Sequence, residues 1–541
     1  MNTANTTLKR FKLGFLLGFY LSFFASSIEL FAWPLTILHT NDHHGRFWPN
    51  EKGEGGLPAR ASYIKSVREE VQKQGGQVLL LDAGDINTGI PHSDSLEALP
   101  DFMGYQKLQY DAVAIGNHEF DNPPEILEKQ QAWLETVPLL SANIFYKKTS
   151  LRPFRPYISK WVNDVKVAII GVTTTSTPFI SNPRNSEHYE FRSPVEVLKQ
   201  LVPKLKEEGH KLIFVVSHVG LEEENNPALS FEGERILAKQ VVGIDAIIGG
   251  HTHTLYQGSI EPNTQTVISQ AASWGKYVGR LNFDVEVQKE NKEIKVKFLG
   301  SEMIPINLKQ KNKEGKLTLV GSKEWPQEEE MTVFLKPFYE EAEKVLNIPV
   351  GNSLDIFPFE TVRKEETAFG KVASNAQRDK VKADLAIVNS GSIRDSLPQG
   401  TISYAALYKI QPFGNTICTV KMTGKELWNY IEEVIKVTWA VGKSVQLSSD
   451  VFVEVNSKTF AVESLKIKGK KIKKNETKNL YTLAVNNFLA VGGDKFPKLT
   501  QHPRFLDTGF VDHQSLKEFV EEKKTLDPKT SEFTQRSFYF K

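Results

Sequence analysis

Residues 112–121 read AVAIGNHEFD, and this stretch decides the fold class of the chain. A short apolar run, AVAI, ends directly in the polar cluster GNHEFD. Short apolar runs that alternate with amphipathic stretches are typical of strands and helices arranged in layers. Because ligands of α/β sheets bind just beyond the strand ends, we expect residues 117–121 to lie at a functional site.

The same pattern recurs on both sides of this stretch. Four other apolar runs end in polar residues, in LTILHT, VLLLDAGD, LIFVVSH and DAIIGGHTH, and the helix-like ARASYIKSVREEVQKQ separates the first two. The oxygen and nitrogen ligands that follow the five runs are Asp42, His44, Asp85, Asn117, His218, His251 and His253. A lone histidine or aspartate at a strand end is most often part of a solvated turn, but five such strand ends in order are not. The set suffices for two divalent ions if one carboxylate bridges them, and such a pair can clamp both oxygens of a displacement at phosphorus.

The composition is that of an ordinary soluble globular protein. The 541 residues are 40% hydrophobic and 24% charged, which excludes a disordered chain and a polytopic membrane protein. A formal charge of +2 excludes a nucleic-acid-binding surface over the whole molecule. The single cysteine, Cys418, excludes an intramolecular disulfide and cysteine-based zinc fingers.

The first residues predict export. Basic residues at 9–12 precede the apolar run 13–25, and small residues follow it, as in a secretory signal peptide. The run is shorter than the roughly 20 residues that span a membrane. We therefore assign residues 1–32 to a signal peptide, with cleavage after Ser27 or after Ala32, and expect a periplasmic or secreted protein.

The chain divides into two α/β units. Residues 33–323 form the first, with a lysine-rich and less patterned stretch at 291–321. Residues 324–348 form a linker, in which Glu324 to Leu346 read as an acidic amphipathic helix. A second unit over 349–541 has its own strand-like runs in ADLAIVNSG, ICTVKMTG and YTLAVNN.

Five motifs in order, DxH, GD, GNHE, a lone His and GHxH, resemble the calcineurin-like metallophosphoesterases. The segments LHTNDHHGRFWPNEKGEGGLPAR, DAGDINTGIPHSD, AIGNHEFDNP, SGSIRDS, QPFGN and FLAVGGDKFP narrow this to the bacterial periplasmic 5'-nucleotidase and UDP-sugar hydrolase family. The resemblance covers essentially all of the chain after the signal peptide. It implies a four-layer α/β/β/α catalytic domain and a C-terminal α/β substrate-binding domain. It also implies hydrolysis of nucleoside 5'-monophosphates, and of UDP-sugars, by a metal-activated water.

The resemblance assigns a role to each motif residue. One ion would be held by Asp42, His44, Asp85 and His253, and the other by Asp85, Asn117, His218 and His251. His118, oriented by Asp121, would bind no metal and would stabilise the transition state or assist the leaving oxygen. We take His43 to be structural. The mixed donors suit Zn, Mn or Co, with Mg also open.

In the C-terminal unit the resemblance implies a nucleotide pocket. Its residues are Arg363 and Arg394 for phosphate, Phe413 and Phe488 for stacking the base, Asp494 for the ribose hydroxyls, and Asn389 and Asn415 for the shape of the pocket. Two positions depart from the bacterial enzymes, since His253 replaces a glutamine and Phe359 replaces a further arginine.

Two other functions compete with this one. The first is that of a 2',3'-cyclic nucleotide 2'-phosphodiesterase/3'-nucleotidase, an enzyme of the same superfamily. A non-catalytic nucleotide-binding surface protein is disfavoured by the complete ligand set. We expect small-molecule nucleotides as partners, no nucleic acid, no membrane beyond the signal peptide, a monomer, and rotation of one domain against the other.

Overall fold

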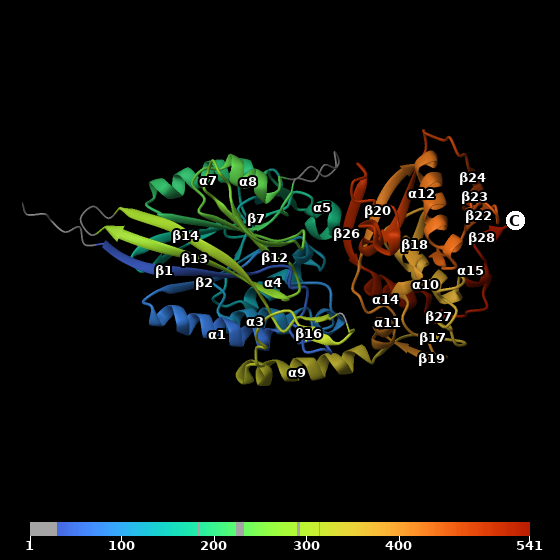
Figure 1. Cartoon of the computed structure of the whole chain (residues 1–541), viewed down its shortest axis with the longest axis horizontal. Coiled ribbons are helices and arrows are strands. Elements are labelled where there is room, and N and C mark those ends of the chain that lie inside the picture. Colours follow the sequence, from blue (N-terminus) through green and yellow to red (C-terminus); the bar gives the residue numbers. More distant parts are fainter. Residues whose placement is uncertain (1–29, 182, 223–231, 289–292, 313) are drawn as a thin grey trace, which may run out of the picture.

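The computed structural model describes residues 30–181, 183–222, 232–288, 293–312 and 314–541. Most of the predicted signal peptide, residues 1–29, lies outside these ranges. Figure 1 shows two α/β lobes, with helix α9 (Glu329–Leu346) running beneath the first and toward the second. Within the described residues, no helix is both long and apolar enough to cross a lipid bilayer.

The first sheet of the N-terminal lobe carries three of the predicted strand ends. In sheet order its strands are β14 (Ile294–Pro305), β13 (Tyr277–Gln288), β1 (Leu30–Thr40), β2 (Gln77–Asp82), β3 (Ala112–Ala114) and β4 (Leu139–Leu140). Strands β1 to β4 are parallel. The polar residues after β1, β2 and β3 therefore meet at one edge of the sheet.

The second sheet carries the other two strand ends. In sheet order its strands are β11 (Leu255–Ile260), β12 (Val267–Ala271), β10 (Ala246–Gly249), β9 (Leu212–His218), β7 (Val165–Thr173) and β6 (Tyr157–Val162). Strands β7, β9, β10 and β12 are parallel. His218 ends β9, and the loop with His251 and His253 follows β10.

The two sheets pack face to face between helices. Along β1 and β2, Ile37 and Leu79 point into the core between the sheets, while their neighbours Leu38 and Leu80 point into the core under α1 (Leu57–Lys73) and α3 (Leu99–Leu108). This alternation follows from the two-residue period of a strand. On the far side, α7 (Pro194–Glu207) and α8 (Glu234–Gln240) cover the second sheet. The expected four-layer α/β/β/α arrangement is confirmed.

The C-terminal lobe contains three sheets. The five-stranded sheet has β21 (Val445–Leu447), β18 (Leu385–Asn389), β25 (Leu480–Asn486), β20 (Thr416–Thr423) and β26 (Phe505–Val511). A four-stranded sheet has β24 (Lys470–Ile472), β23 (Val462–Ile467), β22 (Val451–Val455) and β28 (Phe538–Phe540). A three-stranded sheet has β19 (Gly400–Ser403), β17 (Pro349–Ser353) and β27 (Thr525–Leu526). Helices α10 (Ala368–Lys380), α11 (Tyr404–Ile410), α12 (Gly424–Val437) and α14 (Asp512–Lys523) pack around them. The three strand-like runs expected here form β18, β20 and β25.

Shorter elements complete the chain. They are α2 (Pro91–Asp94), the 3₁₀ turn η1 (His118–Phe120), α4 (Pro124–Trp133), β5 (Ile144–Tyr146), α5 (Thr177–Ile180), α6 (Pro183–Ser186), β8 (Tyr189–Phe191), β15 (Lys309–Lys311), β16 (Leu317–Leu319), η2 (Ser390–Ser392), η3 (Trp439–Val441), α13 (Asn487–Ala490), η4 (Gly493–Lys495) and α15 (Ser531–Thr534).

Helix α9 belongs to both lobes. It begins at Glu329 rather than at the expected Glu324, because the Glu328 side chain accepts a hydrogen bond from the backbone N–H of Met331 and caps the helix. Met331 and Leu335 are buried in the core of the first lobe, whereas Leu346 is buried in a core of the second. The helix is therefore a shared structural element rather than a free linker.

Candidate metal centre

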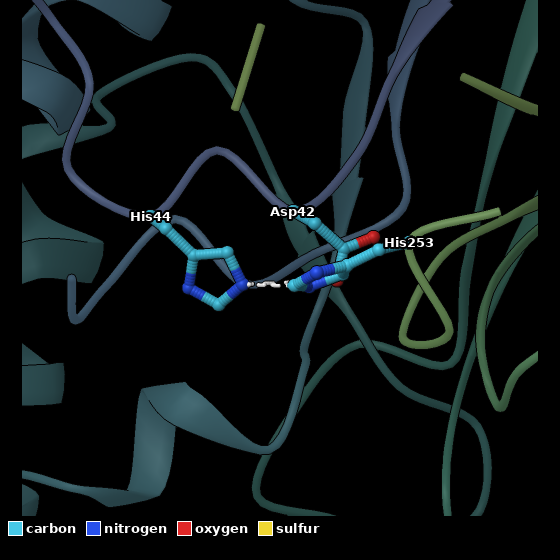
Figure 2. Close-up of side chains that lie close together, drawn as sticks. All are labelled: Asp42, His44 and His253. Atoms are coloured by element: carbon cyan, nitrogen blue, oxygen red, sulfur yellow. Dashed lines mark hydrogen bonds and ion pairs between the residues drawn. The ribbon is translucent and has the colours of Figure 1, made fainter. Parts of the chain in front are cut away.

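The structure brings all seven predicted ligands to one place. Three overlapping groups have donor atoms within 4.8 Å of one another: Asp42, His44 and His253; His44, Asp85 and His118; and Asp85, His218 and His251. The seventh, Asn117, lies with its Oδ1 3.2 Å from His218 Nε2. Figure 2 shows the His44 and His253 rings approaching each other beside Asp42.

Asp85 lies between the two halves of the cluster. In one half, the Nε2 atoms of His44 and His253 are 3.0 Å apart, and Asp42 Oδ1 lies 3.2 Å from the latter. In the other half, Asp85 Oδ2 lies 3.0 Å from His218 Nε2. The same oxygen is 3.9 Å from His44 Nε2. This is the position that a bridging carboxylate requires.

The donor set fits divalent cations. The Nδ1–H of His44 donates to the Thr88 carbonyl at 2.8 Å, and that of His218 donates to the Ala83 carbonyl at 2.7 Å. Each ring therefore turns Nε2 toward carboxylate and amide oxygens, which are acceptors. A proton or a metal cation must lie between Nε2 and these acceptors, and carbonyl bonds to Nδ1 hold histidine ligands in the tautomer that metal binding requires.

The protonation of the histidines agrees with this arrangement. Burial lowers the pKa of both His44 and His251 to about 3, so both rings are neutral at physiological pH. Burial also acts to lower the pKa of His218, but the Asp85 carboxylate outweighs it and raises the pKa to about 9. A divalent ion between His218 and Asp85 would take the place of that proton.

The backbone is strained at the same positions. The ligands with positive φ are Asp42 (51°), His44 (51°), Asp85 (59°), His251 (75°) and His253 (51°). Left-handed backbone is uncommon outside glycine and persists only where surrounding bonds hold it. Here the Asp42 N–H donates to the Gly84 carbonyl at 2.9 Å, and the His251 N–H donates to Asp42 Oδ2 at 3.0 Å.

His118 is paired through Nδ1 with a carboxylate that is not among the predicted ligands. Its Nδ1 lies 2.6 Å from Asp121 Oδ2, and its Nε2 lies 4.0 Å from Asp85 Oδ2. Burial acts to lower the pKa of His118, but Asp121 and Asp85 outweigh it and raise the pKa to about 10. A ring that holds its second proton offers a charge and a donor rather than a lone pair.

Glu119 is a supporting residue that the sequence analysis did not single out. Its carboxylate accepts hydrogen bonds from the backbone N–H groups of Gly116, Asp85 and Ile86 at 2.7, 3.1 and 2.9 Å. It thereby fastens the loops after β2 and β3 to each other. Gly116 is required beside it, because a Cβ there would lie 2.0 Å from Asp85 Oδ1. Gly116 and Glu119 are the first and last residues of the GNHE motif, and this motif is the feature of the sequence that could have identified them.

His43 is packed among other partners. Its Nε2 lies 2.7 Å from Asp101 Oδ1, and its Nδ1 lies 3.2 Å from an Arg60 nitrogen. The side chain is fully buried. These contacts agree with the structural role expected of it.

The structure also clusters most of the predicted nucleotide-pocket residues. Asn389 Nδ2 donates to Asp494 Oδ2 at 3.0 Å, and the Arg394 guanidinium lies 5.6 Å from the centre of the Phe413 ring. Gly391 lies between the two pairs, since it accepts from Arg394 and a Cβ on it would approach Asn389 and Asp494. Phe413 and Phe488 are 46% and 43% exposed, which leaves ring surface for a ligand.

Two further predicted pocket residues, Arg363 and Asn415, have contacts of their own. The Arg363 side chain is exposed, while its carbonyl accepts from the backbone of Ser444. Asn415 Nδ2 donates to Asp512 Oδ2 at 3.1 Å, so its amide faces the start of α14. Phe359, at the position of the expected arginine, packs partly buried against the core.

The metal centre and the nucleotide pocket adjoin at the junction of the lobes. Arg46 donates to the His44 carbonyl at 3.0 Å, and its guanidinium lies 4.1 Å from the centre of the Trp274 ring. A Cβ on Gly414, next to Phe413, would lie 3.7 Å from the Arg46 guanidinium. A cavity of about 670 Å³ also lies between the lobes, lined by Thr88 and Asp121 from the first and by Tyr404 and Gln514 from the second.

Comparisons with known proteins agree with this geometry. Residues 35–255 match the calcineurin-like phosphoesterase family, and residues 349–501 match the 5'-nucleotidase C-terminal domain. A 5'-nucleotidase of Vibrio vulnificus is 38% identical over 518 residues, which cover 92% of this chain and 91% of the relative. The UshA protein of Escherichia coli is 35% identical over 519 residues, 92% of each chain.

A solved structure shares the whole fold. The NAD nucleotidase NadN of Haemophilus influenzae superposes with a TM-score of 0.73 at 23% identity, covering 94% of this chain and 99% of that one. The relatives confirm the resemblance inferred from the motifs, over both lobes together. This chain therefore belongs to the 5'-nucleotidase family of calcineurin-like phosphoesterases.

Proposed function

We propose that this protein is a secreted two-metal 5'-nucleotidase that releases phosphate from nucleoside 5'-monophosphates and also hydrolyses UDP-sugars. The observation that carries the proposal is the convergence of seven histidine, carboxylate and amide side chains, with Asp85 between two groups of histidines. The 5'-nucleotidase relatives, similar over both lobes, support the choice of substrate.

In this proposal Asp42, His44, Asp85 and His253 hold one divalent ion. Asp85, Asn117, His218 and His251 hold the other. The ions would polarise the phosphate and lower the pKa of a water that attacks phosphorus. Mixed imidazole, carboxylate and amide donors favour Zn, Mn or Co over Ca, and Mg remains a candidate.

His118 would act on the reacting phosphate without holding an ion. Asp121 keeps its ring charged and aimed, so Nε2–H can donate to a phosphoryl oxygen as negative charge develops there. The same proton can pass to the leaving oxygen of the nucleoside. Glu119 would act only by holding the loops in register.

The C-terminal lobe would supply substrate recognition. Phe413 and Phe488 would stack on the base, Asp494 would accept from the ribose hydroxyls, and Arg363 and Arg394 would bind phosphate oxygens. Asn389 would hold Asp494 in place through its 3.0 Å bond, and Asn415 would shape the pocket from the side of α14. Phe359 cannot bind phosphate, which leaves more of that task to the two arginines.

We further propose that the signal peptide is removed on export, by cleavage after Ser27 or after Ala32, and that the mature protein is a periplasmic or secreted monomer. Cleavage after Ser27 is the one that keeps Leu30–Ala32, which pair with β13. The domain division at 33–323, 324–348 and 349–541 is part of the same proposal. Osmotic-shock fractionation, N-terminal sequencing and light scattering test these points directly.

The activity is tested by a hydrolysis panel of AMP, UDP-glucose, 2',3'-cyclic AMP and p-nitrophenyl phosphate. We expect AMP to have the highest kcat/KM. A preference for 2',3'-cyclic AMP would instead establish the phosphodiesterase alternative. No turnover of any substrate by metal-loaded protein would favour a binding protein.

Metal dependence is tested on the same panel. Chelation should abolish turnover, and full activity should return when two ions per chain are restored. Full activity of metal-free protein, or saturation at one ion per chain, would contradict the two-metal proposal.

A further inference from the structure

The loop that orients His44 is held from the other lobe. We call residues 87–94, between β2 and the end of α2, the junction loop. At its start, the carbonyl of Thr88 accepts the 2.8 Å hydrogen bond from His44 Nδ1, and the carbonyl of Asn87 lies 3.2 Å from the same nitrogen. The direction of Nε2, the atom that faces the proposed metal, therefore depends on where these two carbonyls point.

The two carbonyls differ in how they are fixed. Asn87 is anchored within its own lobe, since its backbone N–H donates to Glu119 and its side chain forms two hydrogen bonds with Gln130. Among the described residues Thr88 has no such anchoring hydrogen bonds, and its φ of 64° is a strained value for a β-branched residue. A strained conformation of this kind persists only if neighbouring bonds hold it.

Those neighbouring bonds come largely from the C-terminal lobe. The Gly89 carbonyl accepts from His513 Nε2 at 3.2 Å, and Asp94 Oδ2 accepts from Gln514 Nε2 at 2.5 Å. Asp94 in turn accepts from the Gly89 N–H at 3.3 Å. The carbonyl of Gly89, the residue after Thr88, is thus bonded directly to His513 at the start of α14. The N–H of Gly89 is linked to the same helix through Asp94 and Gln514.

The surroundings of His513 fix its position and its tautomer. The side chain is fully buried, and the Tyr404 hydroxyl lies 2.9 Å from its Nδ1. With Tyr404 donating to Nδ1, the ring proton stands on Nε2 and points at the Gly89 carbonyl. A buried donor in a fixed tautomer holds its acceptor more firmly than a solvent-exposed side chain does.

We propose that His513 and Gln514 are positioning residues, which hold Thr88 and Gly89 and thereby aim the His44 ring at the metal centre. Docking of the substrate-binding lobe would then complete the metal site, and separation of the lobes would loosen one of its ligands. The inference rests on the proposed two-metal function, because it takes His44 to be a ligand.

The test uses the full-length protein loaded with Co²⁺. The variants are Gln514→Ala, which removes one bond, and His513→Leu, which removes the other while filling the space. His513→Gln restores a donor near the position of Nε2. Glu522→Ala, an exposed position on the same helix, is the matched control. Thermal unfolding confirms that each variant folds, and Gln514→Ala carries the test if His513→Leu does not.

We expect Q514A and H513L to release one of the two Co²⁺ ions to EDTA about tenfold faster, the lower end of the effect of losing support to a metal ligand. The kcat for AMP should fall with the KM changed less than twofold, because the nucleotide-pocket residues are untouched. H513Q should recover part of both losses, and E522A should match the wild type.

Equal Co²⁺ release and equal kcat in the wild type and in the folded variants would overturn this inference while leaving the proposed function intact. A wild-type protein that binds two Co²⁺ ions and hydrolyses AMP, with these variants altered only in KM, would also overturn it. Failure of the wild type itself to bind Co²⁺ would refute the proposed function, and this inference with it.

Discussion

At the scale of single residues, two neighbours in the GNHEFD stretch are set to opposite tasks by their partners. Asn117 offers an oxygen beside His218, whereas His118 is kept protonated by Asp121. In the proposed function, these adjacent positions separate metal binding from proton donation. The residue types alone do not show the difference, since the other histidines of this centre are proposed ligands.

This separation can be tested by substitution. His118→Ala should leave the metal content unchanged and lower kcat by roughly 10² to 10⁴, the usual contribution of a positioned proton donor. Asp85→Ala should instead lose metal, because it removes the carboxylate proposed to bridge the two ions. Metal analysis and steady-state kinetics on both variants check this. Loss of both ions from His118→Ala would show that His118 is itself a ligand.

The exposed aromatic rings give a second prediction at this scale. Phe413→Ala and Phe488→Ala should raise the KM for AMP, since each stacked base contributes about 1–3 kcal/mol. The KM for p-nitrophenyl phosphate should change little, because that ester lacks a base to stack. Leu480→Ala, an equally exposed apolar position in the same lobe, is the control. A similar KM increase for both substrates would contradict base stacking.

That the seven proposed ligands would come together could be predicted from the sequence, because each of them follows an apolar run. The contribution of Glu119 could not, because its bonds go to backbone N–H groups whose position only the folded loops define. The contact of Asn415 with Asp512 could not be predicted either, since it depends on how the start of α14 meets the start of β20.

At the scale of elements, the strand β14 was not evident from the sequence pattern. The stretch 291–321 was expected to lack clear pattern because of its lysines, yet Ile294–Pro305 forms a full edge strand paired with β13. Lys295 and Lys297 are exposed, while Val296 and Phe298 between them are half-buried against the core. Charged residues on the open face of an edge strand are common, because they discourage pairing with other chains.

Helix α9 gives the prediction at this scale. Leu335→Ala should lower the free energy of unfolding by about 2–5 kcal/mol, because it opens a cavity in the core of the first lobe. Val333→Ala, 66% exposed on the same helix, should change stability by no more than about 0.5 kcal/mol. Urea unfolding of both variants measures the difference. Equal stabilities would mean that α9 is a detachable linker.

At the scale of the whole molecule, the junction between the lobes contains a carboxyl group with an altered proton affinity. Burial raises the pKa of Asp94 to about 7, despite its hydrogen bonds from Gly89 and Gln514. The unfolded chain loses this proton near pH 4. Between about pH 4 and about pH 7 the folded protein therefore keeps a proton that the unfolded chain has lost. The contribution of Asp94 to the free energy of unfolding falls as the pH rises through this range.

Asp94→Asn should remove this part of the pH dependence while keeping an acceptor for Gln514. We expect the stability of the variant relative to the wild type to increase from pH 4 to pH 7 and then to level off. Urea unfolding across this range measures it, with Asp450→Asn at an exposed position as control. A constant difference between D94N and wild type over the range would show that Asp94 is ionised throughout.

The left-handed backbone at five of the proposed ligands has a consequence for protein engineering. Each such position costs of the order of 1–3 kcal/mol, which glycine or asparagine would relieve. A library selected for heat resistance alone would therefore be enriched in these replacements at Asp42, His44, Asp85, His251 and His253. Its most durable members would be proteins that no longer turn over substrate, so any such selection must score catalysis in every round.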